Sequence, residues 1–242
     1  MLLKSVFIAL FSFSILHADT LKECKTEADK ISGCVEREYY SNGNFRRETP
    51  YKNNKANGIA KTYYESGKLM GETPYKNGKI EGIEKRYDEN GNLKIEIPYK
   101  NDKIEGIEKR YYENGNLGVE TPYKNGKKEG IEKRYYENGS LWRKAPYKNG
   151  KIEGIEKWYY ENGNLESEIP HKNDEAHGNL KYYTEDGKLL ALLKAENGKI
   201  TSGKCFNDKV LTNKDLEEIG RFYSAGKAIN YLQKICLKSD SK

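Results

Sequence analysis

Hydrophobic and polar residues alternate along most of the chain in short runs that restart every 24 residues. Glycine keeps this period at residues 43, 67, 91, 115, 139, 163 and 187, and all six prolines keep it at 50, 74, 98, 122, 146 and 170. Alternating runs separated by Asn-Gly or Asn-Asp predict β-hairpins, and a fixed period of this length is typical of a repeat architecture. We therefore expect an all-β fold, an elongated single-layer antiparallel β-hairpin array of about seven 24-residue repeats over residues 35–202.

The copy at residues 83–106 shows how each hairpin is predicted to pair. Asn90-Gly91 favours a two-residue type I′ turn, because both residues tolerate positive φ. Such turns bring acidic and basic residues opposite each other in five copies: Arg37–Glu48, Lys61–Glu72, Lys85–Glu96, Lys109–Glu120 and Lys157–Glu168. They also bring together apolar pairs beside the turn: Tyr40–Phe45, Tyr64–Leu69, Tyr112–Leu117, Tyr136–Leu141 and Tyr160–Leu165. A second tight reversal is expected in segments such as 147–151, and the glycines at 58, 82, 106, 130, 154 and 178 predict a bulge or a close backbone approach.

Alternation along each strand assigns the side chains to two faces. One face is expected to carry the second Tyr of each Tyr-Tyr pair, the Leu after the turn and the Tyr after Pro. The other face is expected to carry the first Tyr, the Lys/Glu pairs and Pro. The predicted register places Trp142 opposite Tyr135 and Trp158 on the other face, which weakens a model with a single sugar-binding groove. The candidate binding surface consists of aromatic residues: Tyr40, Tyr64, Tyr75, Tyr112, Tyr123, Tyr136, Tyr147, Trp158 and Tyr160.

The two ends of the chain depart from the repeat. A short basic start followed by an apolar run predicts a secretory signal peptide at 1–18. An array of seven hairpins would be on the order of 65 Å long at the spacing of β-strands, so disulfides from end to end are implausible. We expect an N-terminal cap at 19–34 with a Cys24–Cys34 disulfide and a helical cap at 203–242 with a Cys205–Cys236 disulfide. Thr212-Asn213 should cap a helix that begins near Lys214, and residues 228–236 form a second amphipathic stretch.

Composition limits the chemistry that the chain is expected to perform. It is 33% charged with a net charge of +6, and the lysine rows are interleaved with glutamate rows, which argues against nucleic-acid binding. His171 and His177 flank Asp174 and Glu175, but without regular ligand spacing, so we expect no metal site. The one histidine outside this segment, His17, lies in the predicted signal peptide, and a catalytic site is not supported. We expect no cofactor and no transmembrane segment in the mature chain.

Residues 111–139, YYENGNLGVETPYKNGKKEGIEKRYYENG, carry a resemblance to a known family. The elements Tyr-Tyr-x-x-Gly-x-Leu, Glu and Tyr-Lys-Asn-Gly-Lys-x-x-Gly resemble the MORN-repeat variant of the bacterial YwqK-type antitoxin family. The resemblance covers about residues 35–202. It implies a β-hairpin array that contacts proteins or membrane surfaces, and the antitoxin label implies a neutralised protein partner.

These observations predict a non-catalytic exported protein, periplasmic or secreted, that contacts a protein or cell-envelope component through a Tyr-rich β surface. An antitoxin-like protein that neutralises a toxin is the alternative, and a carbohydrate-binding module is a second alternative. Among envelope components, an acidic polysaccharide or an anionic lipid headgroup suits the lysine rows best.

Overall fold

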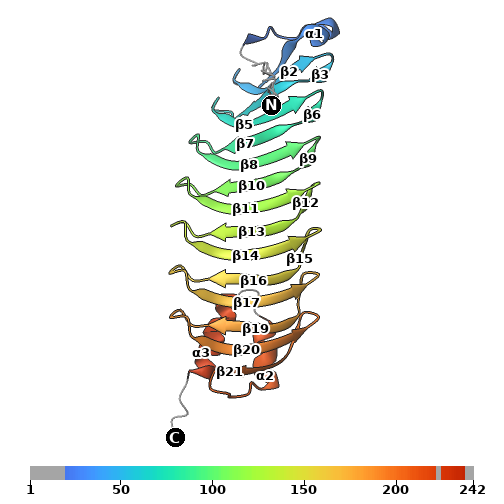
Figure 1. The fold of residues 1–242 in the computed structure, drawn as a ribbon. Helices are drawn as coiled ribbons and strands as arrows, with labels where there is room; N and C mark the ends of the chain where they lie inside the picture. The colour runs from blue at the N-terminus through green and yellow to red at the C-terminus, as the bar shows by residue number, and fades with distance from the viewer. Residues whose placement is uncertain (1–19, 222–224, 238–242) are drawn as a thin grey trace, which may run out of the picture. The chain divides into compact units, whose positions relative to one another are not determined.

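The computed structural model describes residues 20–221 and 225–237, and the predicted signal peptide lies outside these residues. The fold is all-β, and antiparallel hairpins repeat along the chain before two short C-terminal helices (Figure 1). Each complete repeat contributes strands of six, eight and two residues, as in Gly106–Tyr111, Leu117–Lys124 and Lys127–Lys128. The chain forms two compact units, Met1–Gly82 and Ile83–Lys242.

In the first unit, a short helix and a covered strand edge precede the first hairpins. Residues 22–24 lie along β1, where Cys24 donates a backbone hydrogen bond to Val35 and Val35 donates one to Lys22. The predicted Cys24–Cys34 disulfide is present. The elements are α1 (Glu27–Ser32), β1 (Cys34–Tyr39), β2 (Phe45–Lys52), β3 (Lys55–Ala56), β4 (Gly58–Tyr63), β5 (Leu69–Lys76) and β6 (Lys79–Ile80).

The second unit contains the remaining hairpins. Strand β7 begins at Gly82 and continues into this unit. The strands are β7 (Gly82–Tyr87), β8 (Leu93–Lys100), β9 (Lys103–Ile104), β10 (Gly106–Tyr111), β11 (Leu117–Lys124), β12 (Lys127–Lys128), β13 (Gly130–Tyr135), β14 (Leu141–Lys148), β15 (Lys151–Ile152), β16 (Gly154–Tyr159), β17 (Leu165–Lys172), β18 (Glu175–Ala176), β19 (Gly178–Tyr183), β20 (Leu189–Glu196) and β21 (Lys199–Cys205). The helices are α2 (Asn213–Gly220) and α3 (Ala225–Cys236).

The first turn of each repeat differs from the predicted two-residue turn. Between β10 and β11, the Tyr112 N–H donates to the carbonyl of Asn116, and Gly115 takes the positive φ of 82°. Asn114 remains outside the left-handed region, because its Oδ1 accepts the N–H of Asn116 at 2.9 Å. The loop is one residue longer than predicted, so Leu117 pairs with Tyr111 and the predicted Tyr112–Leu117 pair is wrong. The other four predicted pairs beside the turn are wrong for the same reason, because the observed pairs are Tyr39–Phe45, Tyr63–Leu69, Tyr135–Leu141 and Tyr159–Leu165.

A β-bulge directly after this turn restores the predicted register. Arg110 pairs with Val119, which leaves Gly118 as the extra residue. Beyond the bulge, the predicted charge pairs are confirmed at Arg37–Glu48, Lys61–Glu72, Lys109–Glu120 and Lys157–Glu168.

The second turn of each repeat is the tight reversal that the sequence predicts. Lys124 pairs with Lys127 across Asn125 and Gly126, whose φ angles are 52° and 79°. Two central residues with positive φ are typical of a type I′ turn.

The repeated glycine that begins six-residue strands such as β13 marks a close backbone approach. Gly130 has a φ of 113°, and a Cβ there would lie 3.1 Å from Cγ of Pro122. Both the dihedral and the contact with proline require glycine at this position.

Because of the bulge, some residues of the second unit lie on a different face from the one predicted. We call face A the face on which α2 and α3 pack, and face B the opposite one. In the β10–β11 hairpin, face A carries Glu108, Arg110, Thr121 and Tyr123, and face B carries Ile107, Lys109, Tyr111, Leu117, Glu120 and Pro122. The leucine after the turn therefore shares a face with the first Tyr of the pair, whereas the prediction placed it with the second. The predicted grouping of the first Tyr, the Lys/Glu pairs and Pro is confirmed.

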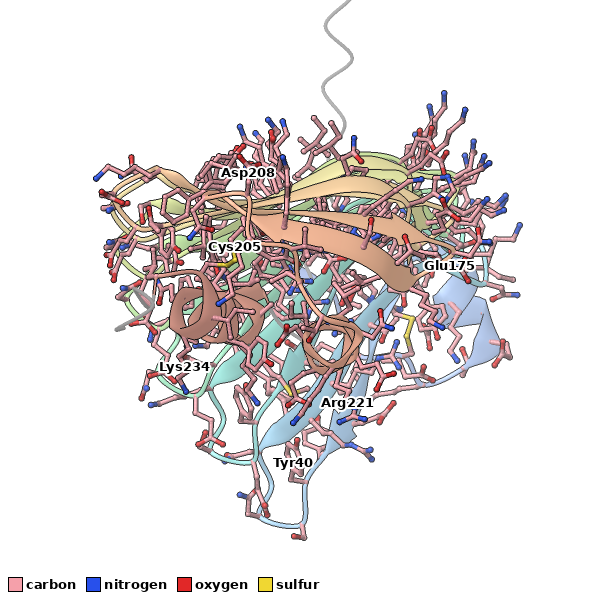
Figure 2. The ribbon with its side chains drawn as sticks, turned by 90° about the horizontal axis from the view of Figure 1, so that it is seen from below. Tyr40, Glu175, Cys205, Asp208, Arg221 and Lys234 are labelled. Carbon is pink, nitrogen blue, oxygen red and sulfur yellow. A yellow bond between two sulfur atoms is a disulfide. The ribbon has the colours of Figure 1, made fainter. Side chains whose placement is uncertain are left out.

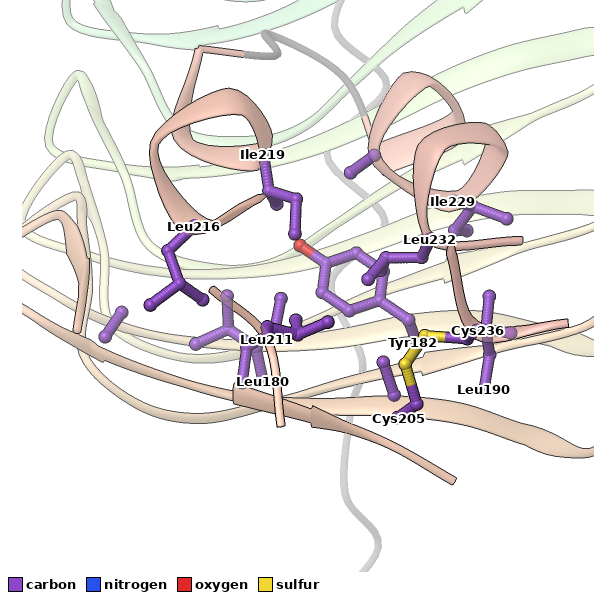
Figure 3. Close-up of a cluster of buried hydrophobic side chains, with 14 residues drawn as sticks. Leu180, Tyr182, Leu190, Cys205, Leu211, Leu216, Ile219, Ile229, Leu232 and Cys236 are labelled. Atoms are coloured by element: carbon purple, nitrogen blue, oxygen red, sulfur yellow. A yellow bond between two sulfur atoms is a disulfide. The ribbon is translucent and has the colours of Figure 1, made fainter. Parts of the chain in front are cut away.

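The two C-terminal helices lie against face A of the last strands (Figure 2). Thr212 caps α2 through a capping box with Asp215, as the Thr-Asn signal predicts. Leu216, Ile219 and Leu232 pack around Tyr182, whose ring lies between the helices and the sheet (Figure 3). The Cys205–Cys236 disulfide joins β21 to α3, as predicted.

The outer edge of β21 is covered by the segment that follows it. Lys204 bridges to Val210, and the Leu211 N–H donates to the carbonyl of Gly203. The helices therefore cover a face of the sheet, and the short 209–211 segment protects its edge. Among the described residues, no helix has both the length and the hydrophobicity needed to cross a bilayer.

Candidate interaction surface

Face A carries a row of buried carboxylates, one from each middle repeat. Glu84, Glu108, Glu132 and Glu156 occupy the same position of successive six-residue strands, and all four are buried. Glu132 is only 1% exposed. A buried carboxylate needs hydrogen-bond donors or a cation, because burial without them is costly. The side chains that bond to these carboxylates therefore form the surface above the row.

In the first two repeats of the row, each carboxylate is bonded to an arginine two residues later. The Nε atom of Arg86 lies 2.6 Å from Oε1 of Glu84, and that of Arg110 lies 2.7 Å from Oε1 of Glu108. The tyrosine that follows proline also lies beside the carboxylate, Tyr99 next to Glu84 and Tyr123 next to Glu108. Burial first, and then the neighbouring carboxylate, raises the pKa of both tyrosines.

Glu132 lies at the centre of a larger cluster. Its carboxylate accepts hydrogen bonds from Lys128 at 2.6 Å, Arg134 at 2.9 Å, Arg143 at 3.0 Å and Thr121 at 3.3 Å. Burial alone would raise the pKa of Glu132, but the hydrogen bonds from Lys128 and Arg134 outweigh it and hold the pKa below its usual value. Glu132 therefore stays ionised and holds three cations on face A.

Arg143 connects this cluster to the next repeat. Its guanidinium also bonds to Glu156, whose other oxygen lies 2.9 Å from Nε2 of His171. Burial opposes a charge on His171, but the bond to Glu156 outweighs this effect and raises the pKa of the imidazole. The Nδ1 atom of His171 lies 3.2 Å from the carbonyl of Asp174, so both ring nitrogens are engaged. Among residues 20–221 and 225–237, no group of three or more His, Cys, Asp and Glu side chains could hold a metal ion.

The sequence-predicted tyrosines fall into two groups. The second Tyr of a pair bonds to the backbone of the next hairpin: the hydroxyls of Tyr40, Tyr112, Tyr136 and Tyr160 donate to the carbonyls of Tyr63, Tyr135, Tyr159 and Tyr183 at 2.7–2.8 Å. The Tyr after Pro lies on face A beside the carboxylate row, where Lys128 stacks 4.7 Å from the ring centre of Tyr147. Tyr64 and Tyr75 occupy the corresponding positions of the first unit. Several of the predicted residues thus link hairpins as well as line the surface.

The two tryptophans lie together, in contrast to the predicted placement on opposite faces. Their ring centres are 5.3 Å apart in an edge-on arrangement, and Tyr136 lies 6.0 Å from Trp142. Tyr135 pairs with Leu141, so Trp142 is the bulge residue and turns to face A with Trp158. Arg143 lies 5.1 Å from the ring centre of Trp158. An aromatic cluster therefore adjoins the carboxylate row.

Face B presents different chemistry. Its tyrosine hydroxyls reach the glutamates of the preceding repeat, from Tyr111 to Glu96 at 2.8 Å and from Tyr135 to Glu120 at 2.9 Å. Burial, together with these bonds, raises the pKa of both tyrosines to about 12. A row of half-exposed isoleucines follows the strand starts: Ile83, Ile107, Ile131 and Ile155.

Sequence reasoning missed the buried carboxylate row. Glu108 lies in the sequence between two residues of face B, and alternation alone does not distinguish a buried carboxylate from a solvated one. The signal that could have identified it is the recurrence of Arg two residues later and Tyr fifteen residues later in successive copies, with Glu84 and Arg86 as the first example. A sheet places those three positions side by side.

The repeats define a class of protein, the β-hairpin repeat proteins. The model of the MORN repeat variant matches residues 35–53, 56–77, 80–101, 104–125, 128–149 and 152–173, which together make up more than half of the chain. The chain belongs to the MORN repeat variant family.

Two further comparisons concern curated proteins and solved structures. No curated protein matches the chain. A solved structure titled "Crystal Structure of TcdB2-TccC3-TEV" is similar to it with 14% sequence identity and a TM-score of 0.20. That match covers 74% of this chain but only 12% of the other.

Proposed function

We propose that this protein is an exported, non-catalytic binding protein that holds an extracytoplasmic partner on face A of its middle hairpins. The observation that carries the proposal is the contrast along face A. The last hairpin is covered by the chain's own helices, whereas the middle hairpins keep half-exposed arginine and aromatic side chains above a buried carboxylate row.

The absence of a catalytic role is part of the proposal. Each of the four carboxylates is bonded to Arg, Lys or His, and these contacts stabilise the sheet without leaving one of the four as an unengaged base. Export is supported by the two disulfides, which persist in oxidising compartments, and by the basic and apolar start of the sequence. Recovery of the chain without residues 1–18 from an extracytoplasmic fraction tests export, and a full-length chain confined to the cytoplasm contradicts it.

The binding role is tested with the oxidised protein immobilised and exposed to the envelope fraction of its native cells. Two variants with the same loss of charge compare the faces: R110Q/R134Q on face A and the neighbouring K109Q/K133Q on face B. We expect the unaltered chain and the face B variant to retain the same component and the face A variant to lose it. Equal retention by all three proteins, or no retention, contradicts the proposal.

The identity of the retained material separates the alternatives. A single protein at a fixed stoichiometry would support the antitoxin-like interpretation. Retention of cell-wall carbohydrate would support a glycan-binding role instead. The candidate aromatic residues of face A, which include Tyr123, Tyr147 and Trp158, are expected to contribute in either case.

A further inference from the structure

The arginines of face A form a row of their own above the carboxylates. Arg86, Arg110 and Arg134 occupy the same position of β7, β10 and β13, one repeat apart. One eight-residue strand lies between successive members, so the row has a spacing of two inter-strand distances, about 10 Å. Their side chains are 54%, 58% and 38% exposed, whereas the carboxylates that hold them are buried.

The geometry of each pair directs positive charge outward. Each arginine donates its Nε–H to the carboxylate beneath it at 2.6–2.9 Å. Within the described chain, no hydrogen bond is found from the terminal amino groups of these three arginines. The carboxylate fixes the fork of the guanidinium, and the free end of the fork suits a second carboxylate or a sulfate. A surface whose fixed charges nearly cancel thus presents cations to the solvent.

The row continues into the aromatic cluster. Trp158 occupies the arginine position one repeat after Arg134, and its ring packs in a T-shaped arrangement with that of Trp142. One repeat further, Tyr182 holds this position and is buried under the helices, so the open row ends there. Three evenly spaced cations followed by an aromatic platform favour a polymer with regularly spaced negative charges and ring faces that can stack.

We propose that face A binds an acidic polysaccharide, whose carboxylates pair with Arg86, Arg110 and Arg134 and one of whose sugar rings packs against the Trp142–Trp158 cluster. This inference rests on the proposed function and specifies the chemistry of its ligand. An acidic protein with similarly spaced carboxylates is the competing occupant, and the experiment below separates the two.

The probe is polygalacturonate, and its fully methyl-esterified form serves as the neutral control. Calorimetric titration of the oxidised full chain should show binding to polygalacturonate only, weakening as salt is added. R86Q/R110Q/R134Q should weaken binding by about tenfold or more, as expected for the loss of several charge-assisted contacts. The matched variant K85Q/K109Q/K133Q removes the same charge from the opposite face and should change the affinity by less than about twofold. Equal losses in both triple variants would indicate unspecific attraction and overturn the proposal.

Two measurements keep the proposal testable if the triple variant does not fold. The single variant R110Q should lose about threefold in affinity while its neighbour K109Q loses none, as the same charge-assisted contact predicts. The chain has only two tryptophans and both belong to the cluster, so binding should change the intrinsic tryptophan fluorescence. Binding without a fluorescence change contradicts the placement at Trp142 and Trp158.

The outcome also separates this inference from the proposed function. If the chain retains a single acidic protein from the envelope fraction through face A but does not bind polygalacturonate, the polysaccharide inference is wrong and the binding role stands. If face A retains nothing and polygalacturonate does not bind, both are wrong.

Discussion

The middle hairpins and the last hairpin of the second unit share one backbone pattern and differ in what covers face A. Where β13 carries Glu132 and Arg134, strand β19 carries Leu180 and Tyr182 at the corresponding positions. Leu180 and Tyr182 belong to the core beneath α2 and α3, whereas Arg134 is half-exposed. The bulge residue changes in the same way, from Trp142 to the fully buried Leu190.

This difference shows that the polar character of face A is not required by the hairpin itself. The same register accommodates leucine when the chain supplies a cover, because apolar surface removed from water stabilises the fold. Where no element of the described chain covers the face, the repeats carry ion pairs and aromatic side chains. The polar repeats therefore mark the part of the sheet that remains available to solvent or a partner.

The largest effect is expected when an apolar residue under the helices is replaced by the carboxylate of the middle repeats. Leu180→Glu places the residue of the middle repeats under the helices, where no arginine holds the charge. We expect a loss of about 4 kcal/mol in the free energy of unfolding, because an unpaired carboxylate is buried in an apolar core. Denaturant unfolding followed by circular dichroism measures it. A loss below about 1 kcal/mol would mean that the helices do not depend on an apolar face.

Removal of the central charge in a middle repeat should have a smaller effect. Glu132→Gln keeps the shape of the side chain but leaves Lys128, Arg134 and Arg143 without their shared counter-ion. We expect a loss of about 2 kcal/mol in the free energy of unfolding. The matched control is Glu113→Gln in an exposed turn, where the side chain is 93% exposed and little change is expected. Equal melting temperatures for the two variants would contradict the structural role of the carboxylate row.

Sequence reasoning predicts the repeat, the disulfides and most of the charge pairing, but not the local geometry of the first turn. The same Asn-Gly dipeptide forms a two-residue turn at Asn125-Gly126 and a three-residue loop at Asn114-Gly115. The difference arises from the side chain of Asn114, which accepts a hydrogen bond from the backbone of Asn116. A dipeptide preference does not predict a side-chain hydrogen bond of this kind. The charge pairs were predicted correctly because the bulge at Gly118 compensates for the longer loop.

The candidate surface was less accessible to prediction for the same reason. The bulge changes the face of the bulge residue and of the leucine before it, so alternation alone assigns Trp142 and Trp158 to opposite faces although their rings are in contact. The burial of Glu132 depends on donors from three strands, and alternation along one strand cannot show it. The repeat period and the turn residues can be recognised from the sequence of each copy, whereas burial depends on side chains from neighbouring copies.

A stabilising change is expected where the covered and open regions meet. Glu166 is buried beside α3, with one carboxylate oxygen 3.7 Å from the position of a Cβ at Gly226. Burial raises the pKa of its carboxyl, and among the described residues no donor to it is found. A carboxyl whose pKa is raised in the folded state opposes folding when it is ionised, and this cost disappears as the pH falls below its pKa.

Glu166→Gln should therefore stabilise the protein at pH 7 by about 1 kcal/mol, which corresponds to about 2–4 °C in melting temperature for a chain of this size. The gain over the unaltered protein should shrink as the pH is lowered and Glu166 becomes protonated. Differential scanning calorimetry at several pH values measures both effects. A lower melting temperature at pH 7 would show that the ionised carboxylate has a stabilising partner.

The smallest effect is expected at His171, where the sixth repeat departs from the tyrosine of the earlier ones. The bond to Glu156 raises its folded-state pKa above the ordinary value of 6.5. The stabilisation from the charged imidazole is therefore fully present below pH 6.5 and is lost as the pH rises through the folded-state pKa. The pKa of Glu156 is lowered by His171 and Arg143 despite its burial, so this partner stays ionised throughout that range.

His171→Tyr restores the repeat pattern with a group that can donate to Glu156, in the position that Tyr123 takes beside Glu108. This tyrosine does not titrate near neutral pH, so the stability of the variant should be flat where that of the unaltered protein falls. Between about pH 6 and about pH 9, we expect the free energy of unfolding of the unaltered chain to fall by less than about 1 kcal/mol relative to that of the variant. Parallel pH profiles would exclude a charged His171–Glu156 pair, and the histidine would then act on face A only as a neutral hydrogen-bond donor.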